Sequence, residues 1–81
     1  MTYEQALDLV KTSLTRIVPD ADFTALGPTD KFRDRLELDS LDFLQFVETL
    51  AELGGCRLDE DDYPRLVTLD GSARLVAERA V

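Results

Sequence analysis

The segment from Ser40 to Leu53 is the feature that most restricts how this chain can fold. Asp39 precedes it as an N-cap and Gly54-Gly55 follows it as a helix stop, so the segment predicts one helix. Its apolar residues are Leu41, Phe43, Leu44, Phe46, Val47, Leu50, Ala51 and Leu53, and they cover most of the circumference. Because such a helix needs neighbours on several sides, we expect it at the centre of the core.

Two amphipathic helices can surround this central helix. Apolar residues recur at helical spacing from Tyr3 to Val18, with Thr2 and Gln5 as a capping box and Pro19 as the end. The last helix is expected from its cap, Thr68, to about Ala80. Its expected buried residues are Leu69, Ala73, Val76, Ala77 and Ala80. Gly71 weakens that prediction, because glycine costs about 1 kcal/mol relative to alanine inside a helix.

The connection from Pro19 to Leu38 is long for a small domain, and loops of this length are usually functional. One helical turn is possible at Phe32 to Leu36, and five apolar residues can pin the loop to the core: Phe23, Leu26, Phe32, Leu36 and Leu38. A short element capped by Asp59 precedes Pro64. We therefore expect an all-α, four-helix bundle of three principal helices and one short helix, as a single domain over residues 1–81.

Charge and cysteine content limit the function classes. Nine Lys and Arg face seventeen Asp and Glu, giving a net charge of −8, which argues against nucleic acid and stable membrane association and favours a basic protein partner. Solubility alone is the alternative explanation. Cys56 is the only cysteine and the chain has no His, so a catalytic thiol is not expected. A single cysteine and an N-terminus without a signal-like apolar run favour a cytoplasmic protein.

The tripeptide Asp39-Ser40-Leu41 contains the first candidate site. By itself it is ordinary helix capping, with Asp39 as the cap and Ser40 as the first helical residue. However, Ser40 follows a long loop and begins the most apolar helix, so its hydroxyl is expected to be exposed. A phosphodiester there would lie near free backbone N–H groups, although Asp39 and Asp42 would partly oppose it.

The run Leu36-Glu37-Leu38-Asp39-Ser40-Leu41-Asp42 resembles the phosphopantetheine attachment motif of acyl carrier proteins. The order of helices and loop extends this resemblance over nearly the whole chain. It implies an acyl-carrier-like bundle in which Ser40 carries a 4′-phosphopantetheine arm from coenzyme A, with Asp39 and Leu41 completing the motif. Such a protein is a carrier and not an enzyme, with no catalytic residues and no metal of its own. Its expected partners are a phosphopantetheinyl transferase and enzymes that load or process acyl groups.

The resemblance also implies a docking surface on the helix that begins at the serine. The matching acids, which would meet basic patches on partner enzymes, are Asp39, Asp42, Glu48 and Glu52. An ordinary solvated face is the alternative. Leu44, Phe46 and Val47 are possible residues lining an acyl chain, with core packing the safer assignment.

Two residues depart from the family pattern. Glu37 stands where the family often has Gly, and a Glu takes a left-handed backbone less easily. Gln45 replaces a common Glu. These departures bear on the pathway more than on the attachment of the arm, and they favour a specialised carrier for fatty-acid, polyketide or related biosynthesis. We expect this carrier to be free-standing and monomeric. Two alternatives remain: an aminoacyl or peptidyl carrier loaded by an adenylating enzyme, and an unmodified acidic helical module that binds a protein partner.

Two charged clusters have simpler interpretations. The acids from Asp59 to Asp62 do not fit a calcium loop, because the sixth position counted from Asp59 is Pro64 where glycine is required. The basic cluster of Lys31, Arg33 and Arg35 is interleaved with acids at Asp30, Asp34 and Glu37, which predicts local salt bridges and not nucleic-acid binding.

Overall fold

The structure is a computed structural model that describes residues 1–80. Its elements are α1 (Tyr3–Ile17), α2 (Phe32–Arg35), α3 (Ser40–Gly54), the 3-10 helix η1 (Glu60–Arg65) and α4 (Leu69–Arg79). Within these residues there is no strand, and only an isolated antiparallel bridge joins Lys31 to Thr68. The prediction of a small all-α bundle is confirmed.

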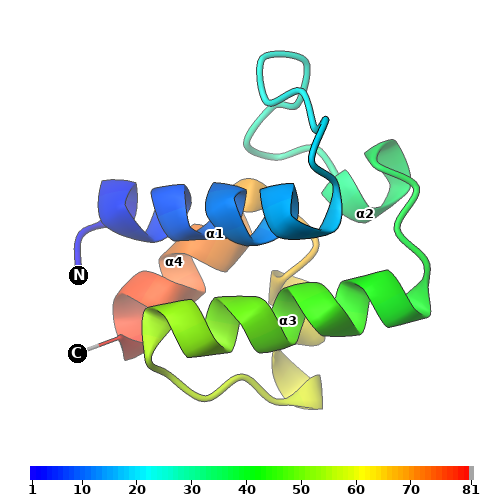
Figure 1. Ribbon diagram of the computed structural model, residues 1–81. Helices are drawn as coiled ribbons and strands as arrows, with labels where there is room; N and C mark the ends of the chain where they lie inside the picture. Colours follow the sequence, from blue (N-terminus) through cyan, green and yellow to red (C-terminus); the bar gives the residue numbers. More distant parts are fainter. Residues whose placement is uncertain (81) are drawn as a thin grey trace.

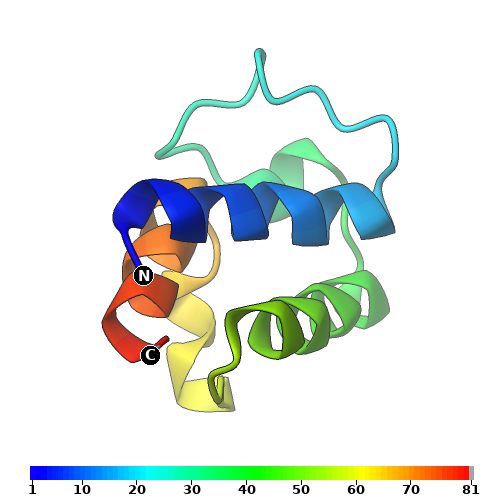
Figure 2. The ribbon, with the colours of Figure 1, turned by 60° about the vertical axis from the view of Figure 1, so that its left-hand side comes forward.

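Helices α1 and α3 lie side by side and run in opposite directions, and α4 packs across α1 (Figure 1). The connection from α1 to α2 arches away from the helices before it returns to the bundle. In Figures 1 and 2 the start of α3 lies at one end of the molecule, and the beginning of α1 and the end of α4 lie at the other. Ser40 is therefore presented far from both ends of the described chain.

The predicted caps form the helix ends. Thr2 accepts a hydrogen bond from the Gln5 N–H at 3.1 Å and donates its own N–H to the Gln5 side chain at 2.9 Å, which completes the capping box of α1. Gly55 ends α3 in the left-handed conformation, with a φ of 61°.

The core contains residues from every α-helix, together with the predicted loop anchors Leu26, Phe32 and Leu38. Phe23 and Leu36 pack against its edge. The Phe32 ring meets the Phe46 ring edge to face at 5.1 Å, so α2 is fixed directly onto α3. The expected helical turn after Lys31 is thus present and anchored.

We expected α3 at the centre of the core, but two of its apolar residues do not face the core. Leu41 is 65% exposed and Leu44 is 42% exposed, whereas Phe43, Phe46 and Leu50 are buried. The buried residues repeat at three- and four-residue spacing and define one face. Leu41 and Leu44 fall outside that face, where no neighbouring helix covers them.

The final helix differs from its prediction in detail. Ala77 and Ala80 are only half-buried, while Ser72 and Leu75 are fully buried. The Ser72 hydroxyl has no hydrogen-bond partner among the described residues. Packing explains why residue 71 is a glycine, because a Cβ at this position would lie 2.4 Å from the Arg65 carbonyl oxygen. The close approach of η1 to α4 therefore requires a residue without a side chain.

Candidate functional site

Ser40 is the exposed serine of this protein. It is the first residue of α3, and the chain's other serines, Ser13 and Ser72, are both fully buried. The Asp39 carboxylate accepts a hydrogen bond from the Asp42 N–H at 2.8 Å, which fixes the first turn of the helix. This cap and the exposed hydroxyl occur together, as the sequence predicted.

A tight reversal after α2 places Ser40. The Leu38 N–H donates to the Arg33 carbonyl at 2.9 Å, and the Glu37 N–H donates to the Asp34 carbonyl at 3.3 Å. These two bonds form a Schellman motif, in which the first residue after the helix cap takes the left-handed conformation. Glu37 does so, with a φ of 55°. The reversal brings the side chain of α2's second residue back toward the start of α3.

Arg33 is a site residue that sequence reasoning missed. Its Nη2 group donates to the Ser40 hydroxyl oxygen at 3.2 Å, and its Nε group donates to the Leu38 carbonyl oxygen at 3.4 Å. Its guanidinium carbon lies 5.0 Å from the centre of the Phe43 ring. The predicted local salt bridging holds for Arg35, which pairs with Asp30 at 3.8 Å, but within residues 1–80 it is wrong for Lys31 and Arg33.

The outward face of α3 mixes apolar and acidic side chains. Leu41, Leu44, Glu48 and Glu52 follow one another at positions i, i+3, i+7 and i+11, and all four are exposed. Gln45 is also exposed on this face, while Asp42 and Thr49 are half-buried at its flank. The outward face is therefore not formed by the predicted acids alone, because two leucines lie on it closest to Ser40.

The predicted site residues fall into two groups. Asp39, Leu41 and Asp42 are near neighbours of Ser40 in the first turn. Glu48 and Glu52 lie about 12 and 18 Å further along the helix axis, at a rise of about 1.5 Å per residue. Among residues 1–80, no ion pair includes any of the four predicted docking acids. Their charges are therefore free to act on a partner surface.

The residues behind Ser40 are packed. Phe46 is fully buried and Val47 is 5% exposed, and both belong to the hydrophobic core. Leu44 does not line the interior, since it is exposed on the outward face. Core packing is thus the structural role of Phe46 and Val47 in this conformation.

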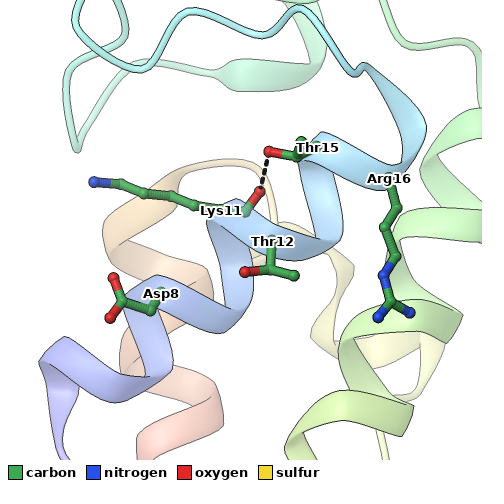
Figure 3. Close-up of a pocket in the computed structure, with 5 residues that line it drawn as sticks. All are labelled: Asp8, Lys11, Thr12, Thr15 and Arg16. Atoms are coloured by element: carbon green, nitrogen blue, oxygen red, sulfur yellow. Dashed lines mark hydrogen bonds between the residues drawn. The ribbon is translucent and has the colours of Figure 1, made fainter.

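A separate hollow of about 520 Å³ lies along α1 (Figure 3). Its walls are Asp8, Lys11, Thr12, Thr15 and Arg16, and none of the predicted site residues takes part. The Thr15 hydroxyl donates to the Lys11 carbonyl within the helix at 2.8 Å. Figure 3 shows Asp8 and Arg16 at opposite ends, so the charged groups do not converge on one point.

Other residues with reactive side chains give little chemistry. Burial raises the pKa of the half-buried Cys56 thiol, which disfavours the reactive thiolate. No cluster of three potential metal ligands occurs in the part of the chain described here. Each helix of residues 1–80 is too short or too polar to cross a membrane.

Comparisons with known proteins found no match for this chain. No protein-family model, no curated protein and no solved structure matches it.

Proposed function

We propose that this protein is an acyl carrier whose Ser40 bears a 4′-phosphopantetheine arm. The resemblance of Leu36 to Asp42 to the attachment motif supports the proposal, as does the exposed hydroxyl at the start of a long capped helix. The observation that carries it is the exposure of Ser40 while Ser13 and Ser72 are fully buried. A modifying enzyme acting on a serine can reach this one without unfolding the bundle.

Loading is a phosphoryl-group transfer from coenzyme A. The Ser40 oxygen attacks the phosphorus next to the pantetheine unit, and the bond from that phosphorus to the adenosine bisphosphate oxygen breaks. The bisphosphate leaves, and the hydroxyl proton passes to a base of the transferase. Any magnesium required belongs to the transferase. The thiol at the end of the arm then forms a thioester with an acyl group.

The outward face of α3 supports a docking role beside the arm. Leu41 and Leu44 offer apolar contacts next to Ser40, and Glu48 and Glu52 offer unpaired negative charge further along. Basic enzymes that handle acyl groups are the partners this surface suits. We place the carrier in the cytoplasm, as a monomer in a specialised fatty-acid, polyketide or related pathway.

The same surface fits the two alternatives. An aminoacyl or peptidyl carrier would use Ser40 in the same way and differ in its cargo. An unmodified interaction module would use only the outward face of α3, and Ser40 would complete the cap. The attachment experiment separates the module from both carriers.

Purified protein is incubated with coenzyme A and broad-specificity phosphopantetheinyl transferases, and the intact mass is measured. We expect the wild type to gain one phosphopantetheine group and Ser40→Ala to gain none. Ser72→Ala is the matched control and should load like the wild type, because its hydroxyl is buried. No adduct on the wild type with several transferases would leave the interaction module as the better proposal, and an adduct on Ser40→Ala would move the site.

A further inference from the structure

One side chain of α2, that of Arg33, contacts the start of α3 at Ser40. Arg33 donates to the Ser40 oxygen at 3.2 Å and to the Leu38 carbonyl at 3.4 Å, while its guanidinium lies over the Phe43 ring. Phe43 is 3% exposed and meets Tyr63 edge to face at 5.2 Å, so the ring under the guanidinium is held in the core. The cation is therefore positioned before any group is attached to Ser40.

Arg33 has no carboxylate partner among residues 1–80. The ion pairs found there use Arg35, Arg57, Arg65, Arg74 and Arg79. A guanidinium has five N–H donors, and Arg33 uses two of them in the contacts above. The remaining donors are available to an acceptor close to the Ser40 oxygen.

A phosphodiester on Ser40 would enter an acidic neighbourhood. Asp39 immediately precedes the serine and Asp42 lies in the same helical turn, so both carboxylates oppose a new anion. Arg33 is the cation in contact with the oxygen that becomes the ester. Guanidinium groups bind phosphate oxygens through paired, charge-assisted hydrogen bonds.

We propose that Arg33 holds the phosphodiester of the arm and offsets the repulsion from Asp39 and Asp42. This inference rests on the proposed attachment at Ser40. After loading, the Nη2 donor moves from the serine oxygen to an unesterified phosphate oxygen, two bonds further out. Arg33 is thus a positioning residue, which fixes the base of the arm at the α2–α3 junction.

The test compares apo and loaded forms of the same variant, with loading verified by intact mass. Arg33→Gln removes the cation, and Arg35→Gln is the matched control in the same helical turn. We expect loading to change the Tm of wild type and Arg35→Gln little. In Arg33→Gln, loading should lower the Tm by about 4 °C or more, a shift typical of one lost interaction in a domain of this size.

A second measurement needs no variant. In ¹⁵N-labelled wild-type protein, the Nε–H signal of Arg33 should shift on loading while that of Arg35 stays in place. Equal loading effects on Tm in wild type and Arg33→Gln, or an unmoved Arg33 signal in protein that mass shows to be loaded, would overturn the role of Arg33. Absence of the adduct would instead overturn attachment at Ser40, so the two failures are distinct.

Discussion

Glu37 takes a backbone conformation that residues with a side chain seldom adopt. Its φ of 55° is in the left-handed region, where the Cβ approaches the following carbonyl at a cost of roughly 1–2 kcal/mol. The conformation is imposed by the Schellman motif, whose bonds join Leu38 to Arg33 and Glu37 to Asp34. The strain therefore lies in the reversal that positions Arg33 beside Ser40.

We expect Glu37→Gly to raise the free energy of unfolding by about 0.5–1 kcal/mol. Glycine removes the left-handed strain, and the gain is reduced by the extra freedom of glycine in the unfolded chain, worth about 0.4–1 kcal/mol. Urea denaturation followed by circular dichroism measures the change. Glu37→Ala removes the same charge but keeps the strain, so it should be less stable than Glu37→Gly. Equal stability of the two variants would show that the backbone at residue 37 carries no such strain.

At the scale of the element, α3 combines the exposed Ser40 at its start with a long outward face. The exposed leucines lie in its first turns, and the exposed Glu48 and Glu52 lie in the next ones. A partner that reaches Ser40 therefore meets apolar surface first and acidic surface further along. Charges of this kind act mainly on the rate of encounter and lose their effect as salt rises.

We expect Asp42→Lys and Glu52→Lys each to slow loading by about fivefold at low salt. One exposed charge pair is worth about 1 kcal/mol in water, which corresponds to a factor of this size. Initial loading rates are measured at about 0.01 M and about 1 M salt, where the Debye length falls from about 30 to about 3 Å. The deficit should disappear at high salt.

Asp8→Lys on α1 is the control for the overall change in charge. Asp8 is exposed and belongs to another helix, so the same substitution there should leave the loading rate nearly unchanged. If the two α3 variants load as fast as Asp8→Lys, or lag equally at both salts, the acidic face is not used for docking.

The helix ends could be predicted from sequence because they depend on local chemistry. Thr2, Asp39 and Thr68 accept hydrogen bonds from backbone groups within three residues, and Gly55 needs no distant partner to end α3. The exposure of Ser40 follows from the same reasoning, since it depends on where one helix begins.

The composition of the site could not be predicted to the same extent. Arg33 lies seven residues before Ser40, and only the left-handed turn at Glu37 brings their side chains together. Glu37 stands where acyl carrier proteins often have Gly, yet the left-handed turn still forms at this residue. The exposure of Leu41 and Leu44 depends on which sides of α3 the other helices leave uncovered, and apolar spacing on α3 alone does not contain that information.

At the scale of the whole molecule, a few ionic contacts join segments that are distant in sequence. Arg79, the last residue of α4, donates to the Asp62 carboxylate in η1 and to the Arg57 carbonyl at 3.3 Å. Asp62 also accepts from the Asp59 N–H at 2.8 Å and is 6% exposed. These contacts hold the C-terminal end of α4 against η1 and the segment that precedes it.

The network around Asp62 makes the stability of the fold depend on pH, as does a second contact in which the Tyr3 hydroxyl donates to the Asp70 carboxylate at 2.8 Å. The hydrogen bond from Arg79 holds the pKa of Asp62 below its usual value, and the hydrogen bond from Tyr3 does so for Asp70. A carboxyl group with a lowered pKa in the folded state stabilises the fold above its unfolded pKa, which is about 3.9 for Asp. That contribution is lost as the pH falls through the lower, folded-state pKa.

We therefore expect the wild-type Tm to be nearly constant from about pH 7 to pH 5 and to fall steeply below, as these carboxylates take up protons. Asp62→Asn should lower the Tm at pH 7 by about 4 °C or more and flatten the fall in acid, because one of the paired charges is already absent. Thermal unfolding followed by circular dichroism across this range measures both effects. Asp61→Asn removes an exposed neighbouring charge and should follow the wild-type curve. If the Tm of Asp62→Asn falls below about pH 5 as steeply as that of the wild type, the Asp62–Arg79 contact does not make the packing of η1 on α4 depend on pH.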